Sequence, residues 1–275
     1  MNLAKLESRI IPKMSFDLHK GEMGRIGVIG GCALYTGAPY YAGISTLRAG
    51  GDLCSIFTSP EAAIPIKCYS PELMVVPSYD CTEWFNRLHI LIIGPGLGRD
   101  PSTVTQVAEI ISKSPIPMVI DADGIYVLEQ NPSILDGREN VILTPNFPEF
   151  QRLCALAKLT PESSPQDLAE SLSCTILLKG KEDSISNGEI TVVCAEEGSP
   201  RRCGGQGDVL SGLTGLFLYW AMKQNLKEPT VSAAWAASKT VKEASKIAFS
   251  KKSYGMSAQE IIEELSPLIS SRSQL

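Results

Sequence analysis

The sequence lacks a hydrophobic run long enough to cross a lipid bilayer. Its longest apolar stretch covers residues 209–222 and is interrupted by Ser211 and Thr214, whereas a membrane-spanning helix needs about 20 apolar residues. Residues 1–13 carry acidic and basic side chains and no apolar segment, which argues against a secretory signal. We therefore expect a soluble, cytoplasmic protein without a membrane partner.

Metal-binding patterns are absent as well. None of the eight cysteines is spaced from another as Cys-x-x-Cys, and the two histidines, His19 and His89, lie far apart in the sequence. A zinc site is therefore not expected. Cysteines such as Cys54 and Cys194 lie in apolar stretches, where they usually act as small buried hydrophobes in a reducing compartment. We expect His89 to be structural and His19 to lie in a solvated loop.

The chain has no strong excess of one charge. Its 25 Lys and Arg residues against 30 Asp and Glu residues give a net charge of −5 at pH 7. General binders of nucleic acid need a basic surface, so we exclude nucleic acid as a partner, while a local basic site around a phosphate stays open. With 44% hydrophobic residues and neither a repeat nor a linker, residues 1–275 are predicted to form a single domain.

Short apolar runs alternate with helical patterns along the chain. Runs that are apolar on both faces are typical of a buried parallel sheet, and Asn187-Gly188 predicts a β-hairpin. We therefore expect an α/β fold in which helices flank a central, mostly parallel sheet on both faces. The predicted strands are 25–29, 53–57, 73–76, 89–93, 118–120, 141–143, 175–178, 184–186 and 189–194, and the predicted helices are 38–49, 103–112, 124–129, 148–157, 165–172, 208–224, 230–249 and 257–268.

The segment from Gly198 to Asp208 has the clearest chemical character. Glycine lets backbone amides approach an anion closely, and the helix that follows offers unpaired N–H groups at its N-terminus. Asp208 falls at or beside the helix cap, so it is either an ordinary N-cap or a general base toward a hydroxyl that attacks a phosphoryl group. Three glycines and two arginines directly upstream exceed what a cap needs and favour an anion site.

Two familiar phosphate-binding motifs are excluded. Gly180-Lys181 is followed by Glu182, so it does not form a P-loop, and Gly94–Gly98 contains a proline and lacks the dinucleotide-binding spacing. Asp121 and Asp123 follow an apolar strand, where α/β sheets bind ligands. These two carboxylates either act through Mg²⁺ or cap the helix that begins near Gly124.

Five motifs occur in a fixed order: Gly94–Arg99, Asp121–Gly124, Leu143–Asn146, Leu178–Gly180 and Gly204–Asp208. Together they resemble the ATP- or ADP-dependent NAD(P)H-hydrate dehydratases of the ribokinase-like superfamily. The resemblance runs from about residue 19 to residue 268, and the run 201–203, Arg-Arg-Cys, resembles the eukaryotic, ATP-using branch. It implies a ribokinase-like fold and one dehydratase-like domain, without the epimerase domain that is often fused to bacterial relatives.

The resemblance implies a carbon–oxygen lyase that repairs damaged cofactors. Its substrates would be ATP and the (6S) hydrate of NADH or NADPH, and its cofactor would be Mg²⁺ bound with ATP. The alternative is a ribokinase-like small-molecule kinase that phosphorylates an alcohol of a vitamin precursor. A catalytically inactive nucleotide-binding module is disfavoured because both Lys179 and Asp208 are present. The metal ligands and a homo-oligomeric state stay open.

The resemblance also implies the site residues. Asp208 would be catalytic, and Tyr35, Thr36 and Ala38 would border the hydrate pocket. Without the resemblance, Lys179 is a solvated lysine at a strand end. The hydrate is expected at Gly98, Asn146, Phe147, Pro148, Glu149, Phe150, Gln151, Arg152 and Asp208. The nucleotide is expected at Lys179, Gly180, Lys181, Glu182, Asp183, Gly198, Ser199, Pro200, Arg201, Arg202, Cys203, Gly204, Gly205, Gln206 and Gly207.

Overall fold

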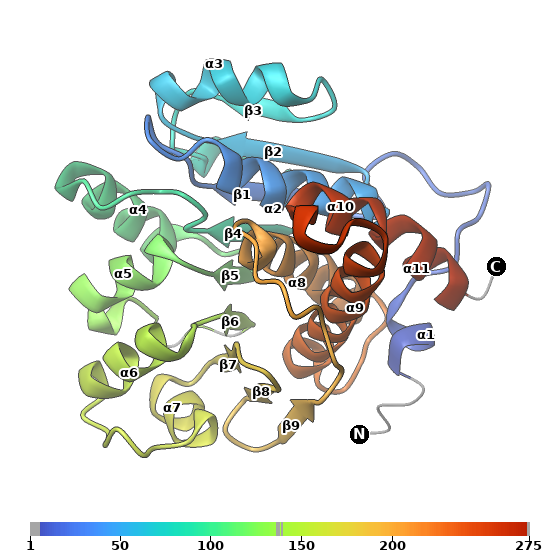
Figure 1. Ribbon diagram of the computed structural model, residues 1–275. Helices are drawn as coiled ribbons and strands as arrows, with labels where there is room; N and C mark the ends of the chain where they lie inside the picture. The colour runs from blue at the N-terminus through green and yellow to red at the C-terminus, as the bar shows by residue number, and fades with distance from the viewer. Residues whose placement is uncertain (1–5, 136–137, 139, 274–275) are drawn as a thin grey trace.

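Nine strands form one sheet through the middle of the protein. They are β1 (Arg25–Ile29), β2 (Leu53–Phe57), β3 (Met74–Val76), β4 (Ile90–Ile93), β5 (Met118–Ile120), β6 (Val141–Leu143), β7 (Thr175–Leu178), β8 (Asp183–Ser186) and β9 (Thr191–Cys194). Their order across the sheet is β3-β2-β1-β4-β5-β6-β7-β8-β9 (Figure 1). Neighbours from β3 to β7 are parallel, and the β7–β8 and β8–β9 pairs are antiparallel. The predicted mostly parallel sheet is confirmed.

The structure, a computed structural model, describes residues 6–135, 138 and 140–273. The ends of the predicted 1–275 domain, and residues 136, 137 and 139, lie outside the described residues. Within the described part, the strands agree with the predicted runs to within a residue or two at each end. The predicted hairpin turn at Asn187-Gly188 joins β8 to β9, and the Asn187 side chain accepts a hydrogen bond from the amide of Ile190 at 2.8 Å.

Helices cover both faces of the sheet (Figure 1). One face carries α4 (Pro101–Lys113), α5 (Asp123–Gln130), α6 (Phe147–Leu156) and α7 (Pro165–Leu172). The other carries α2 (Gly37–Arg48), α8 (Gln206–Lys223) and α9 (Pro229–Lys252), with α1 (Leu6–Ile10), α10 (Ala258–Glu263) and α11 (Leu265–Arg272) packed outside them. Helix α3 (Pro60–Tyr69) lies beside the edge strand β3. Short 3₁₀ turns occupy Thr82–Trp84, Pro132–Leu135 and Ser253–Gly255.

Three helical features differ from the predicted pattern. Helices α1 and α3 were not predicted. Helix α3 begins at Pro60, behind a Ser59 cap, and also contains Pro65 in its interior. A helix tolerates proline in its first turn, as at Pro60. The predicted helix 257–268 is wrong as one unit, because α10 ends at Glu263 and α11 begins at Leu265. Pro267 has no N–H to donate to the carbonyl of residue 263, which explains the break.

A half-buried histidine, His89, links the amino ends of β1 and β4. The ring of His89 stacks on Tyr219 with centroids 4.2 Å apart, and its Nδ1 accepts a hydrogen bond from the Arg25 amide at 3.2 Å. Burial lowers the pKa of His89 to about 4, with help from the charge of Arg25. The histidine is therefore neutral and structural, as predicted. His19 is exposed in a loop.

Helix α8 is buried along most of its length because it lies between the sheet and its neighbours α2 and α9. Its approach to α2 is close at Gly212, where an added Cβ would lie 2.2 Å from the carbonyl oxygen of Ala42 and 2.2 Å from the Ser45 hydroxyl. Although α8 is apolar, no helix among the described residues combines the length and the apolar character needed to cross a membrane.

This contact predicts the effect of a small substitution. Gly212→Ala forces α2 and α8 apart and should lower the free energy of unfolding by about 1–3 kcal/mol, the usual cost of overpacking. Gly255→Ala is the matched control, because a Cβ there meets no atom within 4 Å. Urea unfolding of both variants measures the difference, and equal stability of the two would contradict the close packing of α2 on α8.

Candidate active site

The carboxyl ends of the parallel strands meet at one edge of the sheet, where ligands bind in folds of this class. Asp121 directly follows β5 and Lys179 directly follows β7. The first turn of α8 reaches the same edge, since a Cβ added at Gly207 would lie 3.7 Å from the Lys179 Nζ. The structure thus brings together residues 121, 179 and 207, which are far apart in the sequence.

Lys179, which is partly buried, forms an ion pair with the buried carboxylate of Asp121. The Lys179 Nζ lies 2.8 Å from the Asp121 Oδ1, and Asp121 is only 1% exposed. The Lys179 amide donates to the carbonyl of Pro145 at 2.9 Å, so the side chain reaches across the end of β6 to meet its partner. The interpretation of Lys179 as a solvated strand-end lysine is therefore wrong.

Three carboxylates share the positive charge of this lysine. Burial opposes the charged form of Lys179, but Asp121, Glu149 and Asp208 together raise its pKa. Burial also raises the pKa of Asp208, to about 7; the charge of Asp121 adds to this increase and that of Lys179 opposes it. A carboxylate that titrates near neutral pH is suited to accept a proton.

Asp208 does not cap its helix. The cap position of α8 is Gly205, whose φ of 88° lies in the left-handed region, and Asp208 is the third residue of the first turn. A Cβ at Gly205 would lie 2.7 Å from the Tyr41 ring, so the turn needs glycine. The N-cap interpretation of Asp208 is wrong, and the general-base interpretation is the one that its burial supports.

The loop after β4 fits against the end of β5. A Cβ at Gly94 would lie 1.9 Å from the carbonyl oxygen of Asp121, which explains why the loop begins with glycine. The Gly98 amide donates to the Asp123 carboxylate at 3.0 Å, and Arg99 lies 3.2 Å from the same group. Helix α5 begins at Asp123 with Ala122 as its cap, so the capping interpretation of Asp121 and Asp123 is also wrong.

Residues bordering this loop come from the start of α2. A Cβ at Gly96 would lie 2.9 Å from the Tyr35 Cβ and 3.1 Å from the Ala38 Cβ. Thr36 lies between them, and its hydroxyl is 2.7 Å from the Tyr69 hydroxyl. These residues therefore border the loop that contains Gly98.

The predicted hydrate-binding stretch begins α6. Asn146 and Glu149 form a reciprocal capping box, with hydrogen bonds of 3.0 and 2.8 Å. Burial raises the pKa of Glu149. Phe147 is 56% exposed, whereas Phe150 is buried in the core. Arg152 is paired with Glu129 at 2.8 Å, and Asn146 and Phe147 are exposed at the start of α6.

The two predicted nucleotide-binding segments are fixed by α9 and its neighbours. The buried carboxylate of Asp183 accepts hydrogen bonds from the Gly180 amide at 2.8 Å and the Ser238 hydroxyl at 2.5 Å. The Ser199 amide donates to the Ser245 hydroxyl at 3.0 Å. Asp183 therefore holds the turn 180–182 in place.

The remaining members of these segments differ in exposure. Arg201 donates to the carbonyl of Met256 at 2.7 Å. The side chains of Lys181, Glu182 and Arg202 are exposed. A Cβ added at Gly204 would meet no described atom within 4 Å. The sequence did not point to Ser238, Lys242 or Ser245 on α9. Polar residues of a helix that is covered by its neighbours form no recognisable sequence motif.

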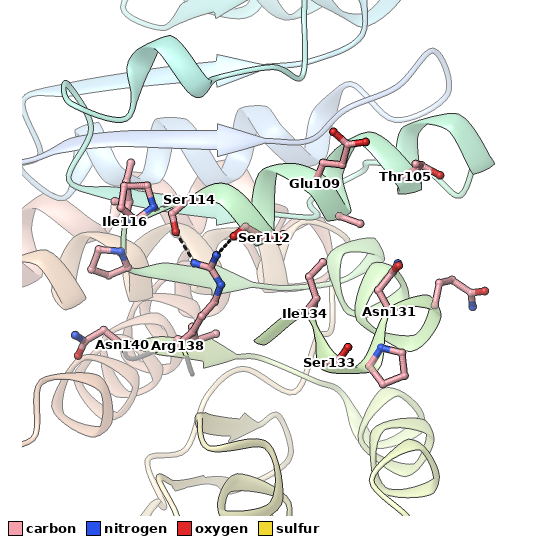
Figure 2. Close-up of a pocket in the computed structure, with 16 residues that line it drawn as sticks. Thr105, Glu109, Ser112, Ser114, Ile116, Asn131, Ser133, Ile134, Arg138 and Asn140 are labelled. Atoms are coloured by element: carbon pink, nitrogen blue, oxygen red, sulfur yellow. Dashed lines mark hydrogen bonds between the residues drawn. The ribbon is translucent and has the colours of Figure 1, made fainter. Parts of the chain in front are cut away.

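A cavity lies at the other edge of the sheet, where the parallel strands begin. Its volume is about 1080 Å³. Figure 2 shows that it is lined by the end of α4, the turn Pro132–Leu135 and the starts of β5 and β6, with Arg138 donating to the carbonyls of Ser112 and Ser114. It contains none of the predicted site residues and borders positions outside the described residues.

Comparison with known proteins matches this architecture. A family model described as NAD(P)H-hydrate dehydratase matches residues 26–267. The chain is 45% identical over 276 residues to an ATP-dependent (S)-NAD(P)H-hydrate dehydratase of Entamoeba histolytica, covering 95% of this chain and 91% of that one.

Solved structures give the same fold. A ribokinase-like superfamily protein of Enterococcus faecalis aligns with a TM-score of 0.86 at 25% identity, covering 100% of this chain and 96% of the other. An ADP/ATP-dependent NAD(P)H-hydrate dehydratase of Bacillus subtilis, crystallised with ATP/Mg²⁺, aligns with a TM-score of 0.73 at 22% identity, covering 98% and 96%. The predicted ribokinase-like fold is confirmed.

The raised pKa of Asp208 predicts a pH-dependent stability difference. Its folded-state pKa of about 7 exceeds the ordinary value of 3.8, so the folded protein binds this proton more tightly than the unfolded chain. The stabilisation is present below the unfolded pKa and is lost as pH rises through about 7. Asp208→Asn does not titrate, so it should be more stable than the parent at pH 8, with the difference narrowing at pH 5. Urea unfolding at both values tests this, and a pH-independent difference would contradict it.

Proposed function

The chain belongs to the NAD(P)H-hydrate dehydratase family, and from this premise we propose that it dehydrates the (6S) hydrate of NADH or NADPH at the expense of ATP. The products are the restored dinucleotide, ADP and phosphate. One observation of the site carries the proposal: the partly buried carboxylate of Asp208, with its pKa raised to about 7, lies in the first turn of α8 close to Lys179. This supports the assignment of a proton acceptor beside a site for phosphate.

The chemistry explains why a lyase needs ATP. Hydroxide is a poor leaving group, so the hydroxyl on the hydrated ring must first be converted into a better one. Its oxygen attacks the γ-phosphorus, the bond from that phosphorus to ADP breaks, and Asp208 accepts the hydroxyl proton. The ring carbon–oxygen bond then breaks and inorganic phosphate leaves. Loss of a proton from the neighbouring carbon restores the ring double bond.

The phosphate side of the site is formed by α8 and β7. The amides at the start of α8 are unpaired within the helix and carry the positive end of its dipole. Lys179 adds a full positive charge close to Gly207. Groups that are already oriented toward the transferring phosphoryl stabilise its charge without reorganising. We assign ATP to Gly204–Gly207 and Lys179, with the exposed Lys181 and Arg202 at the rim.

The hydrate side is assigned to the loop after β4 and to the start of α6, which follows β6. Gly98 is held with φ of +78° by its hydrogen bond to Asp123, and the start of α6 presents Asn146, Phe147 and Glu149. A half-exposed aromatic ring beside a polar helix terminus suits a ligand with a flat ring and polar groups. We assign the nicotinamide half of the hydrate to this surface.

Magnesium fits this site as a companion of ATP. The described residues contain no group of three or more His, Cys, Asp or Glu side chains that could hold a metal ion by themselves. Mg²⁺ is usually held by one or two carboxylates together with nucleotide phosphates. Glu149, whose charge raises the pKa of Lys179, is the carboxylate we assign to it, where the hydrate surface meets the nucleotide site. When bound, the ion would neutralise phosphate charge.

We extend the proposal to the rest of the chain and its setting. One sheet collects strands from residue 25 to residue 194, and the helices that cover it are packed against α10 and α11, of which α11 ends at Arg272. This supports a single domain over residues 1–275. All eight cysteines, which lie in the described part, are free thiols, and this supports a reducing compartment such as the cytoplasm.

The direct test follows ATP and the dinucleotide together. The purified protein is incubated with the (6S) hydrate, ATP and Mg²⁺, and the release of phosphate and the recovery of dihydronicotinamide absorbance are recorded. The proposal requires both to occur in equal amounts. ATP consumption without recovered absorbance would support a kinase instead, and no ATP consumption would indicate a binding module.

Asp208→Asn tests the general base. The substitution keeps the shape of the side chain but removes its ability to accept a proton, so kcat should fall by about 10²–10⁴, the usual contribution of a general base. Binding of ATP, measured by calorimetry, should persist. A folded variant whose turnover stays within about threefold of the parent, far from that range, would exclude Asp208 as the base.

Phe147→Ala tests the hydrate surface. The exposed ring adds little to folding, so the variant should keep its stability while KM for the hydrate rises about two- to tenfold, the worth of one aromatic contact. The KM for ATP should not change. Tyr254→Ala removes an aromatic ring that is 88% exposed elsewhere and serves as the control. An equal rise in both KM values for Phe147→Ala would refute the assignment.

A further inference from the structure

Asp121 is a deeply buried carboxylate that no step of the proposed reaction uses directly. It is 1% exposed, and its Oδ1 lies 2.8 Å from the Lys179 Nζ. Burying two charges costs several kcal/mol per ion before their attraction is counted, and an apolar pair of similar volume is often as stable. Stability alone therefore does not account for an ion pair at this place.

The position of Lys179 is itself unfavourable without a partner. Its ammonium lies close to the start of α8, where the helix dipole repels positive charge. Two other carboxylates, Glu149 and Asp208, are near enough to interact with it. A close pairing with Asp208 would favour the charged carboxylate and lower its basicity. The observed pairing is with Asp121 instead.

The backbone makes this choice of partner possible. Asp121 follows β5 and Lys179 follows β7, so one strand, β6, separates them in the sheet. The Lys179 amide is bonded to Pro145 at the end of that strand, which fixes the root of the side chain. Asp121 fixes the ammonium at the other end of the Lys179 side chain. Asp121 is itself held in place, because its carbonyl packs against Gly94 so closely that no side chain would fit at that glycine.

We propose that Asp121 is a positioning residue that holds the Lys179 ammonium at the first turn of α8, ready for a nucleotide phosphate and apart from Asp208. Asp121 acts through Lys179 and does not touch the substrate. The inference rests on the proposed use of ATP but concerns binding alone. It is therefore tested without the hydrate and without turnover.

A double-mutant cycle separates this role from a direct one. The affinity for Mg²⁺–ATP is measured by calorimetry for the parent, Asp121→Asn, Lys179→Met and the double variant. Asp121→Asn should weaken binding about tenfold, within the range by which contacting charges are coupled. In the Lys179→Met background the same change should have no further effect, because no ammonium remains to be positioned. Asp121→Glu, which keeps the charge, should recover part of the affinity.

Two controls keep the result interpretable. Asp52→Asn removes a carboxylate that accepts amide hydrogen bonds from Gly21 and Met23, away from the site, and should leave ATP affinity unchanged. Melting temperatures identify variants that fail to fold. If Asp121→Asn does not fold, the affinity for Mg²⁺–ATP is still compared between Lys179→Met and the double variant, which lacks both charges. The two affinities should be equal.

The outcomes distinguish this inference from the proposed function. An equal effect of Asp121→Asn in both backgrounds, or no effect in either, would overturn the positioning role. Failure of the parent to bind Mg²⁺–ATP would overturn it too. Coupled binding effects in a protein that does not dehydrate the hydrate would overturn the proposed reaction and leave the positioning role standing.

Discussion

The ion pair between Lys179 and Asp121 is the interaction around which the site is arranged. It links the ends of β5 and β7 across β6 and places one positive charge at the start of α8. The pKa of Asp208 is raised mainly by burial, with a further increase from the charge of Asp121 and an opposing effect of Lys179. The same ion pair therefore influences Asp208 and fixes the positive charge at the start of α8.

Close backbone approaches allow these charges to meet. Gly94 lets the loop after β4 lie on the carbonyl of Asp121, and Gly205 lets the chain turn into α8 against Tyr41. On the other side, α9 holds Asp183 through Ser238 and Ser199 through Ser245, in the two segments that we assign to the nucleotide. The glycines therefore allow close packing at this edge of the sheet, and the polar residues of α9 hold the loops at the edge in place.

Much of the fold follows from local pattern. Continuous apolar runs predicted the parallel strands, because strands covered on both faces need apolar residues throughout. The split between α10 and α11 was missed, since one proline decides it. At the site, the motifs identified Asp208 and Lys179, but not their relation. Asp208 resembles a helix cap in sequence, and only the turn at Gly205, three residues earlier, shows that it is not one. The pairing of residues 121 and 179 depends on the strand order, which no local motif encodes.

The central claim is that Asp208 accepts the substrate proton from an environment that raises its pKa to about 7. The most direct measurement is the pH dependence of kcat/KM for dehydration, which reports the pKa values of the free enzyme. If Asp208 must be ionised, kcat/KM rises with pH along a single limb with a midpoint near 7 and then levels off, and the limb is lost in Asp208→Asn. A rate that is constant down to the ordinary carboxyl range, about pH 4, would contradict the account.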